Sequence, residues 1–171
     1  MNSKRLQFER IARNIAQNLY LYIGAEVDIR FDYEADDGSL DGNVISLGME
    51  DENTYLQVIG GSHLKNPFPI QANKQAIYIN DTNINRIYHG EGIGAIYLHP
   101  LARSRALIII CGTDEVGLEK AAKLFPYRTG VGQPDWIVVG SKMGVQGMQG
   151  VKAMGYYSNL WDIEAGVSYF S

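Results

Sequence analysis

"ALIIICGTDEVGLEKAAKLFPYRTGVGQPDWIVVG", residues 106–140, contains an apolar strand, a glycine turn, a helix and a second apolar strand. The helix is expected over residues 115–125, where apolar side chains recur at the spacing of one helical face. Pro126 then ends it, because proline cannot continue a helix. This order of elements predicts a βαβ unit with a right-handed crossover.

Three more apolar runs precede this unit, each bounded by glycine, proline or a polar residue. They are "TYLQVIGG" (54–61), "QAIYIN" (75–80) and "GAIYLHP" (94–100). Runs that are apolar on both faces are typical of central strands covered on both sides. We therefore predict an α/β fold, a three-layer sandwich with a largely parallel or mixed central sheet, whose βαβ core spans residues 54–140.

The first third of the chain leads into this core. Apolar residues with helical spacing predict a helix over about residues 3–20. From Ala25 to Tyr33 apolar and charged residues alternate, which indicates a strand with one solvated face. A second strand is expected at residues 44–49, so that residues 25–49 form a β-hairpin-like region. Residues 1–171 are predicted to form a single domain.

Composition excludes several classes of function. The chain is 46% hydrophobic with a formal net charge of −4, and its charges are interspersed. That balance predicts a globular, soluble chain and disfavours nucleic acid or an anionic membrane as a partner. The first residues are too polar for a secretory signal, no run is long enough to span a membrane, and the compartment stays undetermined. A single cysteine, Cys111, favours neither a disulfide nor a zinc site, and no metal is predicted.

The turn after residue 111 is the first candidate site. A phosphate-binding loop needs a Gly-Lys-Ser/Thr sequence, and a dinucleotide fingerprint needs glycine where Asp114 stands. No cofactor is therefore expected. Gly112 is interpreted as the tight bend, with Thr113 or Asp114 capping the following helix. Cys111 is either a nucleophile paired with a histidine or, in the favoured interpretation, a small buried apolar residue.

A second candidate follows residue 59. Gly60-Gly61-Ser62-His63-Leu64 matches the nucleophile elbow of serine hydrolases except at its last position, where Leu64 replaces glycine. Asp81 and then His89 or His99 would complete the order of a triad. Two prolines soon after Leu64 disfavour the helix that an elbow requires. The alternative is a polar loop.

Two surfaces are expected to bind a ligand or partner. The carboxyl ends of parallel strands meet at one edge of a sheet, which would place Gly60, Gly61, His63 and Asn66 beside Gly112, Thr113 and Asp114. Glycines recur between residues 140 and 155 and predict a loop with a short helix. Beyond them lie aromatic residues, Trp161 above all, that either cover the core or form an interface, including one between copies of the chain.

Three segments together resemble a known family. They are "GEGIGAIYLHPL" (90–101), residues 106–140, and "GVKAMGYYSNLW" (150–161). They resemble the C-terminal domain of large, mostly fungal and microbial proteins whose upstream part is an α/β-hydrolase of the prolyl-oligopeptidase or dienelactone-hydrolase type. The likeness covers residues 54–161.

In those proteins the serine triad lies upstream of this region. The resemblance therefore implies a non-catalytic accessory or interaction module, whose partner is an upstream or separate hydrolase domain acting on ester, peptide or glycan substrates. The alternative function is a small serine hydrolase or esterase that uses Ser62 with a histidine.

Overall fold

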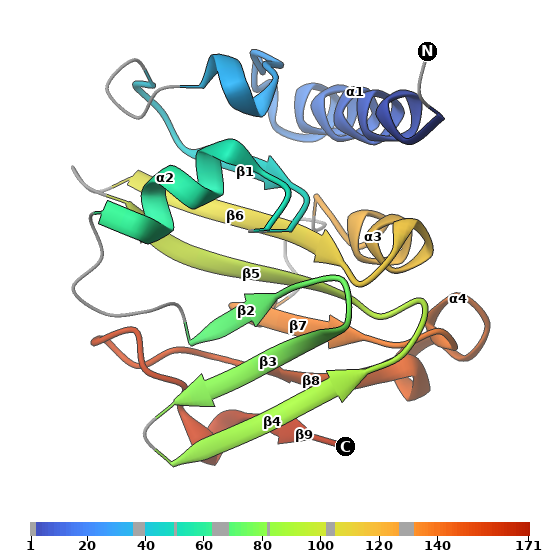
Figure 1. The fold of residues 1–171 in the computed structure, drawn as a ribbon, viewed down its shortest axis with the longest axis vertical. Helices are drawn as coiled ribbons and strands as arrows, with labels where there is room; N and C mark the ends of the chain where they lie inside the picture. The colour runs from blue at the N-terminus through green and yellow to red at the C-terminus, as the bar shows by residue number, and fades with distance from the viewer. Residues whose placement is uncertain are drawn as a thin grey trace.

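Two β-sheets form the centre of the computed structural model, which describes residues 3–35, 40–49, 51–62, 69–81, 83–101, 105–126 and 132–171 (Figure 1). The larger sheet has six strands in the order β1 (Val44–Leu47), β6 (Arg105–Gly112), β5 (Gly94–Leu101), β7 (Trp136–Val139), β8 (Val151–Gly155) and β9 (Tyr169–Phe170). The smaller sheet is antiparallel and has the order β2 (Ile70–Ala72), β3 (Ala76–Asp81) and β4 (Ile84–His89).

The predicted α/β sandwich is wrong, because the described part of the chain is mostly β. Only β1 and β6 pair in parallel, and every other neighbouring pair in the two sheets is antiparallel. The helices are α1 (Ser3–Ile23), α2 (Thr54–Ser62), α3 (Glu115–Ala122) and α4 (Met143–Gln146), with short 3-10 turns at Asp32–Glu34, Gly147–Gly150 and Ala165–Val167. Of the helices, only α1 is long, and none of the described helices is long and apolar enough to cross a membrane.

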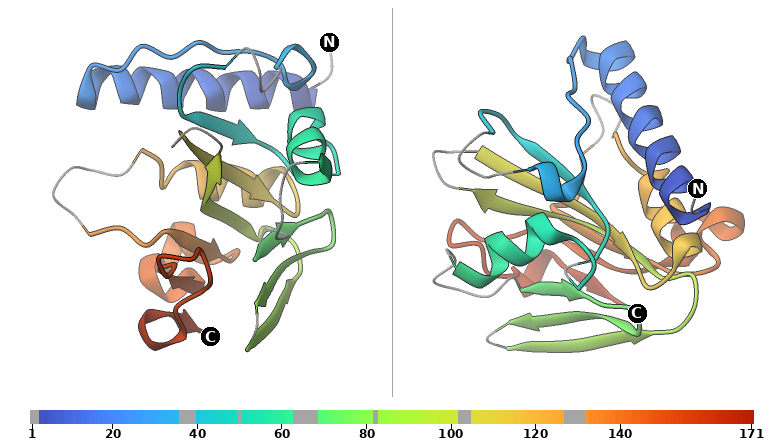
Figure 2. Two further views of the ribbon diagram at one scale, coloured as in Figure 1. Left: turned by 90° about the vertical axis from the view of Figure 1, so that its left-hand side faces the viewer. Right: turned by 45° about the horizontal axis from the view of Figure 1, so that its top comes forward.

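Each face of the large sheet is covered by a different kind of layer (Figure 2). On one face α1 and α3 pack on the cluster that contains Ile96 and Ile110. On the other face α2 and the small sheet pack on the cluster that contains Tyr97 and Ile109. Neighbouring residues of one strand therefore point into two cores. This explains the doubly apolar runs: a second sheet, rather than a layer of helices, covers one face.

The strand–helix–strand order at residues 106–140 is confirmed as β6, α3 and β7. β5 lies between β6 and β7 and is antiparallel to both. Backbone approaches backbone where α3 crosses these strands. A Cβ on Gly94 would lie 2.1 Å from the Gly117 carbonyl oxygen, and a Cβ on Gly112 would lie 2.1 Å from the Leu118 nitrogen. The glycines therefore allow α3 to sit directly on the sheet.

The first third of the chain departs from prediction at two places. The expected helix is confirmed as α1, but residues 25–31 pair with no strand in the described structure, and β1 pairs in parallel with β6 instead of forming a hairpin. The run at residues 54–61 is α2, not a strand. Tyr55, Leu56 and Ile59 are buried while Gln57 and Val58 are exposed, which is the spacing of one helical face.

The glycine-rich segment contains the expected short helix, α4. The strand that follows it, β8, was missed. Gly150 is the last residue of the irregular stretch. A Cβ at this position would lie 2.3 Å from the Cα of Met143, so only glycine fits there. Residues two apart in a regular strand point to the same face, but Val151 and Ala153 of β8 lie in different cores. The register shift between them, a β-bulge, accounts for this change of face.

Candidate functional site

The Gly112–Asp114 turn is a structural corner whose polar atoms bind the chain itself. Asp114 caps α3 by accepting from the Gly117 N–H at 2.7 Å, and its other carboxylate oxygen accepts from the Gly92 N–H at 2.6 Å. The Thr113 hydroxyl donates to the Gly90 carbonyl at 2.9 Å, and its backbone N–H donates to the Ile93 carbonyl at 2.9 Å. The predicted helix cap is confirmed, and these groups of Thr113 and Asp114 form hydrogen bonds within the chain.

The two candidate nucleophiles lie on different kinds of element, Cys111 on strand β6 and Ser62 at the end of helix α2. Cys111 is fully buried in the core between the two sheets. Ser62 ends α2, so the strand that an elbow needs before its serine is absent there. His63 and Asn66 lie outside the described residues. His89 is exposed on β4, whereas burial on β5 lowers the pKa of His99 to about 4 and keeps its ring neutral.

The expected shared edge does not form. α2 runs back along the sheet, so the end of α2 that leads toward β2 lies at the left of Figure 1, while the turn from β6 into α3 lies at the right. The α2 end carries Gly60, Gly61 and Ser62, and the turn carries Gly112 to Asp114. The two groups therefore lie on opposite sides of the molecule in this view.

Trp161 lies at a boundary rather than in the core. Its side chain is 40% exposed, its φ is +67°, and its ring centroid is 5.7 Å from that of Tyr157. Tyr157 itself packs on the core, and burial, followed by the nearby carboxylates Asp135 and Asp81, raises the pKa of its phenol. Trp161 thus covers the edge of a buried aromatic residue with one face and remains accessible on the other.

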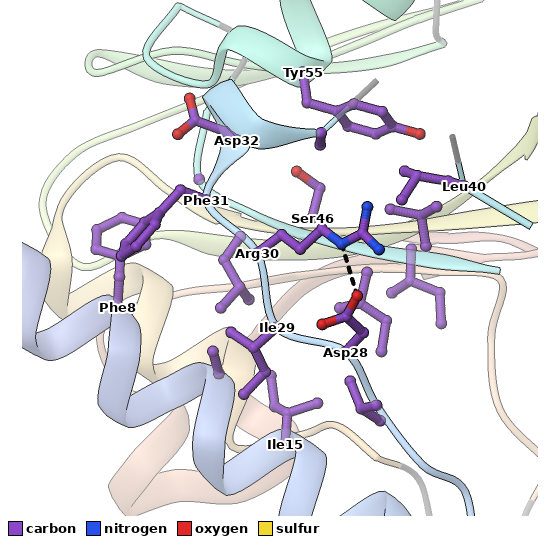
Figure 3. Close-up of a pocket in the computed structure, with 18 of the residues that line it drawn as sticks. Phe8, Ile15, Asp28, Ile29, Arg30, Phe31, Asp32, Leu40, Ser46 and Tyr55 are labelled. Carbon is purple, nitrogen blue, oxygen red and sulfur yellow. Dashed lines mark hydrogen bonds and ion pairs between the residues drawn. The ribbon is translucent and has the colours of Figure 1, made fainter. Parts of the chain in front are cut away.

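A groove lies at the β1 edge of the large sheet (Figure 3). Its volume is about 1320 Å³, above the usual range of roughly 300–1,000 Å³ for small-molecule pockets. α1 supplies Ile15 and Leu19 to its lining, and the sheet supplies Ile45 and Ile108. Apolar side chains therefore line the wall between the helix and the edge strand.

Residues 25–31, here called the strap, cross this groove. Figure 3 shows Asp28, Ile29, Arg30 and Phe31 on an extended segment between α1 and β1. One end is tied to α1, where the Ala25 N–H donates to the Leu19 carbonyl. The other end is held by the Arg5 guanidinium, which lies 4.3 Å from the centre of the Phe31 ring.

The 3-10 turn that follows the strap attaches it to α2. There the Asp32 carboxylate accepts from the Thr54 N–H at 2.8 Å. Between the two ends, residues 26–30 make one described polar contact, the exposed ion pair of Arg30 with Asp28 at 2.7 Å. The described contacts that tie the strap to other elements thus lie at its two ends.

The outer edge of β1 has open hydrogen-bonding groups. The Gly48 N–H donates to the Ile110 carbonyl, so residues 44, 46 and 48 point their backbone groups at β6 in this parallel pair. Ile45 and Leu47 therefore point theirs away from β6. The Leu47 carbonyl accepts from the Asn53 side chain at 3.2 Å. Within the described residues, the Ile45 N–H and carbonyl and the Leu47 N–H have no hydrogen-bond partner.

The charged groups of the groove have an acidic excess. Six carboxylates and three cationic side chains line it. Each cation pairs with a lining carboxylate: Lys4 with Glu52 at 2.6 Å, Arg5 with Glu9 at 3.1 Å, and Arg30 with Asp28. Hydrogen bonds from Lys4 and then from Lys74 lower the pKa of Glu52. The carboxylates left without a cationic partner in the described structure are Glu26, Asp32 and Asp41.

The described lining contains neither histidine nor cysteine, and its serine, Ser46, accepts a hydrogen bond from Asn53 at 3.1 Å. Among the residues with described positions, no group of three His, Cys, Asp or Glu side chains is placed to hold a metal ion. The groove thus combines apolar walls, unpaired backbone groups and negative charge.

Sequence reasoning did not find this groove. The apolar residues at the end of α1 and on the strap belong to neither described core, and of these Ile23, Val27 and Ile29 line the groove. Tyr20, Leu21, Tyr22 and Ile23 are each more than half exposed, and Ile29 is 49% exposed. Clusters of exposed apolar side chains mark interaction surfaces.

Comparison with known proteins gives one partial likeness. The chain is 41% identical over 80 residues to an uncharacterized secreted protein of Arthroderma benhamiae. The match covers 47% of this chain but 8% of that protein, so the likeness spans less than a tenth of the relative's length. No protein-family model matches the chain, and no solved structure matches it.

Proposed function

We propose that the chain acts as a non-catalytic interaction module that packs through its groove against another polypeptide within a larger protein. The observation that carries this proposal is the groove, which has apolar walls and a β1 edge without a strand partner in the described structure, and which the strap crosses without pairing to that edge. Its volume of about 1320 Å³ suits a macromolecular partner better than a small molecule.

The kind of larger protein follows from two likenesses. The partial relative is far longer than the matched segment and is named as secreted, which supports a module of a larger secreted protein. The resemblance noted in the sequence supports a hydrolase domain as the neighbour, acting on ester, peptide or glycan substrates. In this proposal the hydrolase supplies the chemistry and this module supplies a docking surface.

Sedimentation velocity of a mixture tests the proposal. The Arthroderma protein is produced without the 80 matched residues and mixed with this chain. We expect a complex at micromolar concentration and turnover of p-nitrophenyl acetate by the larger protein alone. Two components that sediment independently would overturn the interaction, and an inactive larger protein would overturn the association with a hydrolase.

A second assay separates this function from the serine hydrolase alternative. The isolated chain and its Ser62→Ala variant are compared for turnover of p-nitrophenyl acetate. We expect both to match the buffer rate. Turnover by the chain that the Ser62→Ala substitution removes would show that the chain itself is the hydrolase.

A further inference from the structure

We propose that the groove binds its partner as an added β-strand: an extended, basic segment of polypeptide pairs with the outer edge of β1, beneath the strap. This inference rests on the proposed function and names the chemistry of the partner. Three observations carry it, namely the open edge, the groove beside it and the charge of its lining.

The open edge supplies the hydrogen bonds. Ile45 presents both its N–H and its carbonyl away from β6, and Leu47 presents its N–H in the same direction. Edge strands with unpaired backbone groups are templates for another strand, and proteins ordinarily cover or charge them. Here the β1 edge carries no such protection in the described structure, because the strap passes over the groove without pairing to it.

The groove supplies room and side-chain contacts. A strand added at β1 would lie in the hollow that α1, β1 and the strap enclose. Alternate side chains of that strand would point toward the apolar wall formed by Ile15, Leu19 and Ile45. The intervening side chains would point toward Ser46 and Tyr55 on the opposite side of the edge. Recognition by strand addition uses this combination of backbone pairing and alternate side-chain contacts.

The lining selects the charge of the partner. Glu26 on the strap, Asp32 at its end and Asp41 before β1 have no cationic partner in the described residues. Lysine or arginine at alternate positions of the added strand would neutralise this excess. A second copy of this chain, with its net charge of −4, is a poorer match than a basic segment.

The occupant is therefore a basic segment of the larger protein to which the proposed module belongs. The partial relative offers a large excess of chain outside the matched region. A strand from such a region would be held beside the groove by the covalent chain, which raises its effective concentration.

Binding of synthetic peptides to the full 171-residue chain tests the proposal. The probes are the acetylated and amidated peptides KVKVKVKV and EVEVEVEV, and a form of KVKVKVKV in which every peptide nitrogen is methylated. Binding is followed by fluorescence anisotropy, and amide hydrogen exchange of Ile45 and Leu47 by NMR. We expect KVKVKVKV to bind and to slow exchange at both amides by at least about tenfold, because each N–H gains a partner.

Variants of Ile45 separate backbone pairing from apolar capture. Proline at this position removes the outward N–H, while the ladder to β6, which uses residues 44, 46 and 48, keeps its hydrogen bonds. Ile45→Ala removes the same side chain and keeps the N–H. We expect the Ile45→Pro variant to bind KVKVKVKV about tenfold more weakly than the Ile45→Ala variant, with similar far-UV circular dichroism.

Four results would overturn the proposed addition of a basic strand from another segment. They are equal binding of the methylated peptide, tighter binding of EVEVEVEV, protection of the two amides that rises with chain concentration alone, and protection in the free monomer. The third would show a second copy as the occupant, and the fourth would show that the strap itself pairs with β1. If the Ile45→Pro variant does not fold, the methylated peptide and the exchange data decide. A complex in the sedimentation assay without peptide binding would refute strand addition and leave the proposed function standing.

Discussion

Replacing Asp114 distinguishes a structural corner from a ligand site. Its carboxylate accepts one hydrogen bond from the Gly117 N–H at the start of α3 and another from the Gly92 N–H in the turn before β5. Asp114→Ala removes both acceptors and leaves both N–H groups in a partly buried position. Asp114→Ser keeps a hydroxyl that caps α3 and is too short to reach Gly92 as well.

The expected losses follow from these two contacts. Loss of a helix N-cap costs about 1 kcal/mol, and loss of a hydrogen bond to a charged acceptor costs about 1.5–3 kcal/mol. The free energy of unfolding should therefore fall by about 3 kcal/mol in Asp114→Ala and by about 2 kcal/mol in Asp114→Ser. In a chain of this length, 3 kcal/mol corresponds to a fall in Tm of about 6–12 °C.

Urea unfolding followed by tryptophan fluorescence measures these losses. Asp28→Ala is the matched control, because Asp28 is also an aspartate with a short ion pair but is exposed, at 69%. We expect that control to change stability by less than about 0.5 kcal/mol. An Asp114→Ala variant as stable as the wild type, or more stable, would refute the corner and favour a ligand site, where stability is often given up for function.

The sequence predicted those features that are local in the chain. The cap on α3 is such a feature, because Asp114 and Gly117 are three residues apart and their contact needs no other element. The strands at β5, β6 and β7 are also local, since their apolar runs end at glycine or proline. The run at residues 54–61 shows the limit of this reasoning. A short apolar run fits a strand or a buried helix, and the exposure of Gln57 and Val58 decides it only in the structure.

The partners of the strands were beyond the sequence. Ile79 and Ile96 lie in similar apolar runs, yet β3 belongs to the small sheet and β5 to the large one. A strand that is apolar on both faces indicates that both faces are covered. It does not indicate whether helices or a second sheet cover them, or in which direction the neighbouring strands run. Antiparallel pairing of β5 with both β6 and β7 therefore could not be read from composition.

The strap shows why the candidate site was missed. Alternation from Ala25 to Tyr33 predicted a strand, and the structure has an extended segment there without a ladder. The period of apolar residues indicates an extended backbone, but a strand also needs a partner strand. The nearest open edge, at β1, lies across the groove from the strap. The mismatch between a strand-like sequence and an unpaired segment was the signal that pointed to the site.

Three further perturbations test the fold. Gly117→Ala should destabilise the chain by about 2 kcal/mol despite alanine's preference for helices, because its Cβ would lie 2.0 Å from the Ile93 carbonyl oxygen; an increase in the urea midpoint would contradict the close packing of α3. The buried Cys111 thiol should react with Ellman's reagent only in denaturant, and rapid reaction in native buffer would show that the core between the sheets opens. The pH dependence of unfolding tests the burial of His99. Because burial lowers the pKa of His99 from 6.5 to about 4, the unfolded chain binds a proton between these pH values that the folded chain does not. The contribution of the neutral His99 to the free energy of unfolding is therefore fully present above pH 6.5. It falls as the pH drops, by about 2 kcal/mol between pH 7 and pH 5. The lowered pKa values of Glu52 and Glu119 act below about pH 4.5 and so lie outside this window. Urea titrations at pH 7, 6 and 5 should show the fall in the wild type and not in His99→Gln, and an equal fall in both chains would assign the pH dependence to other groups.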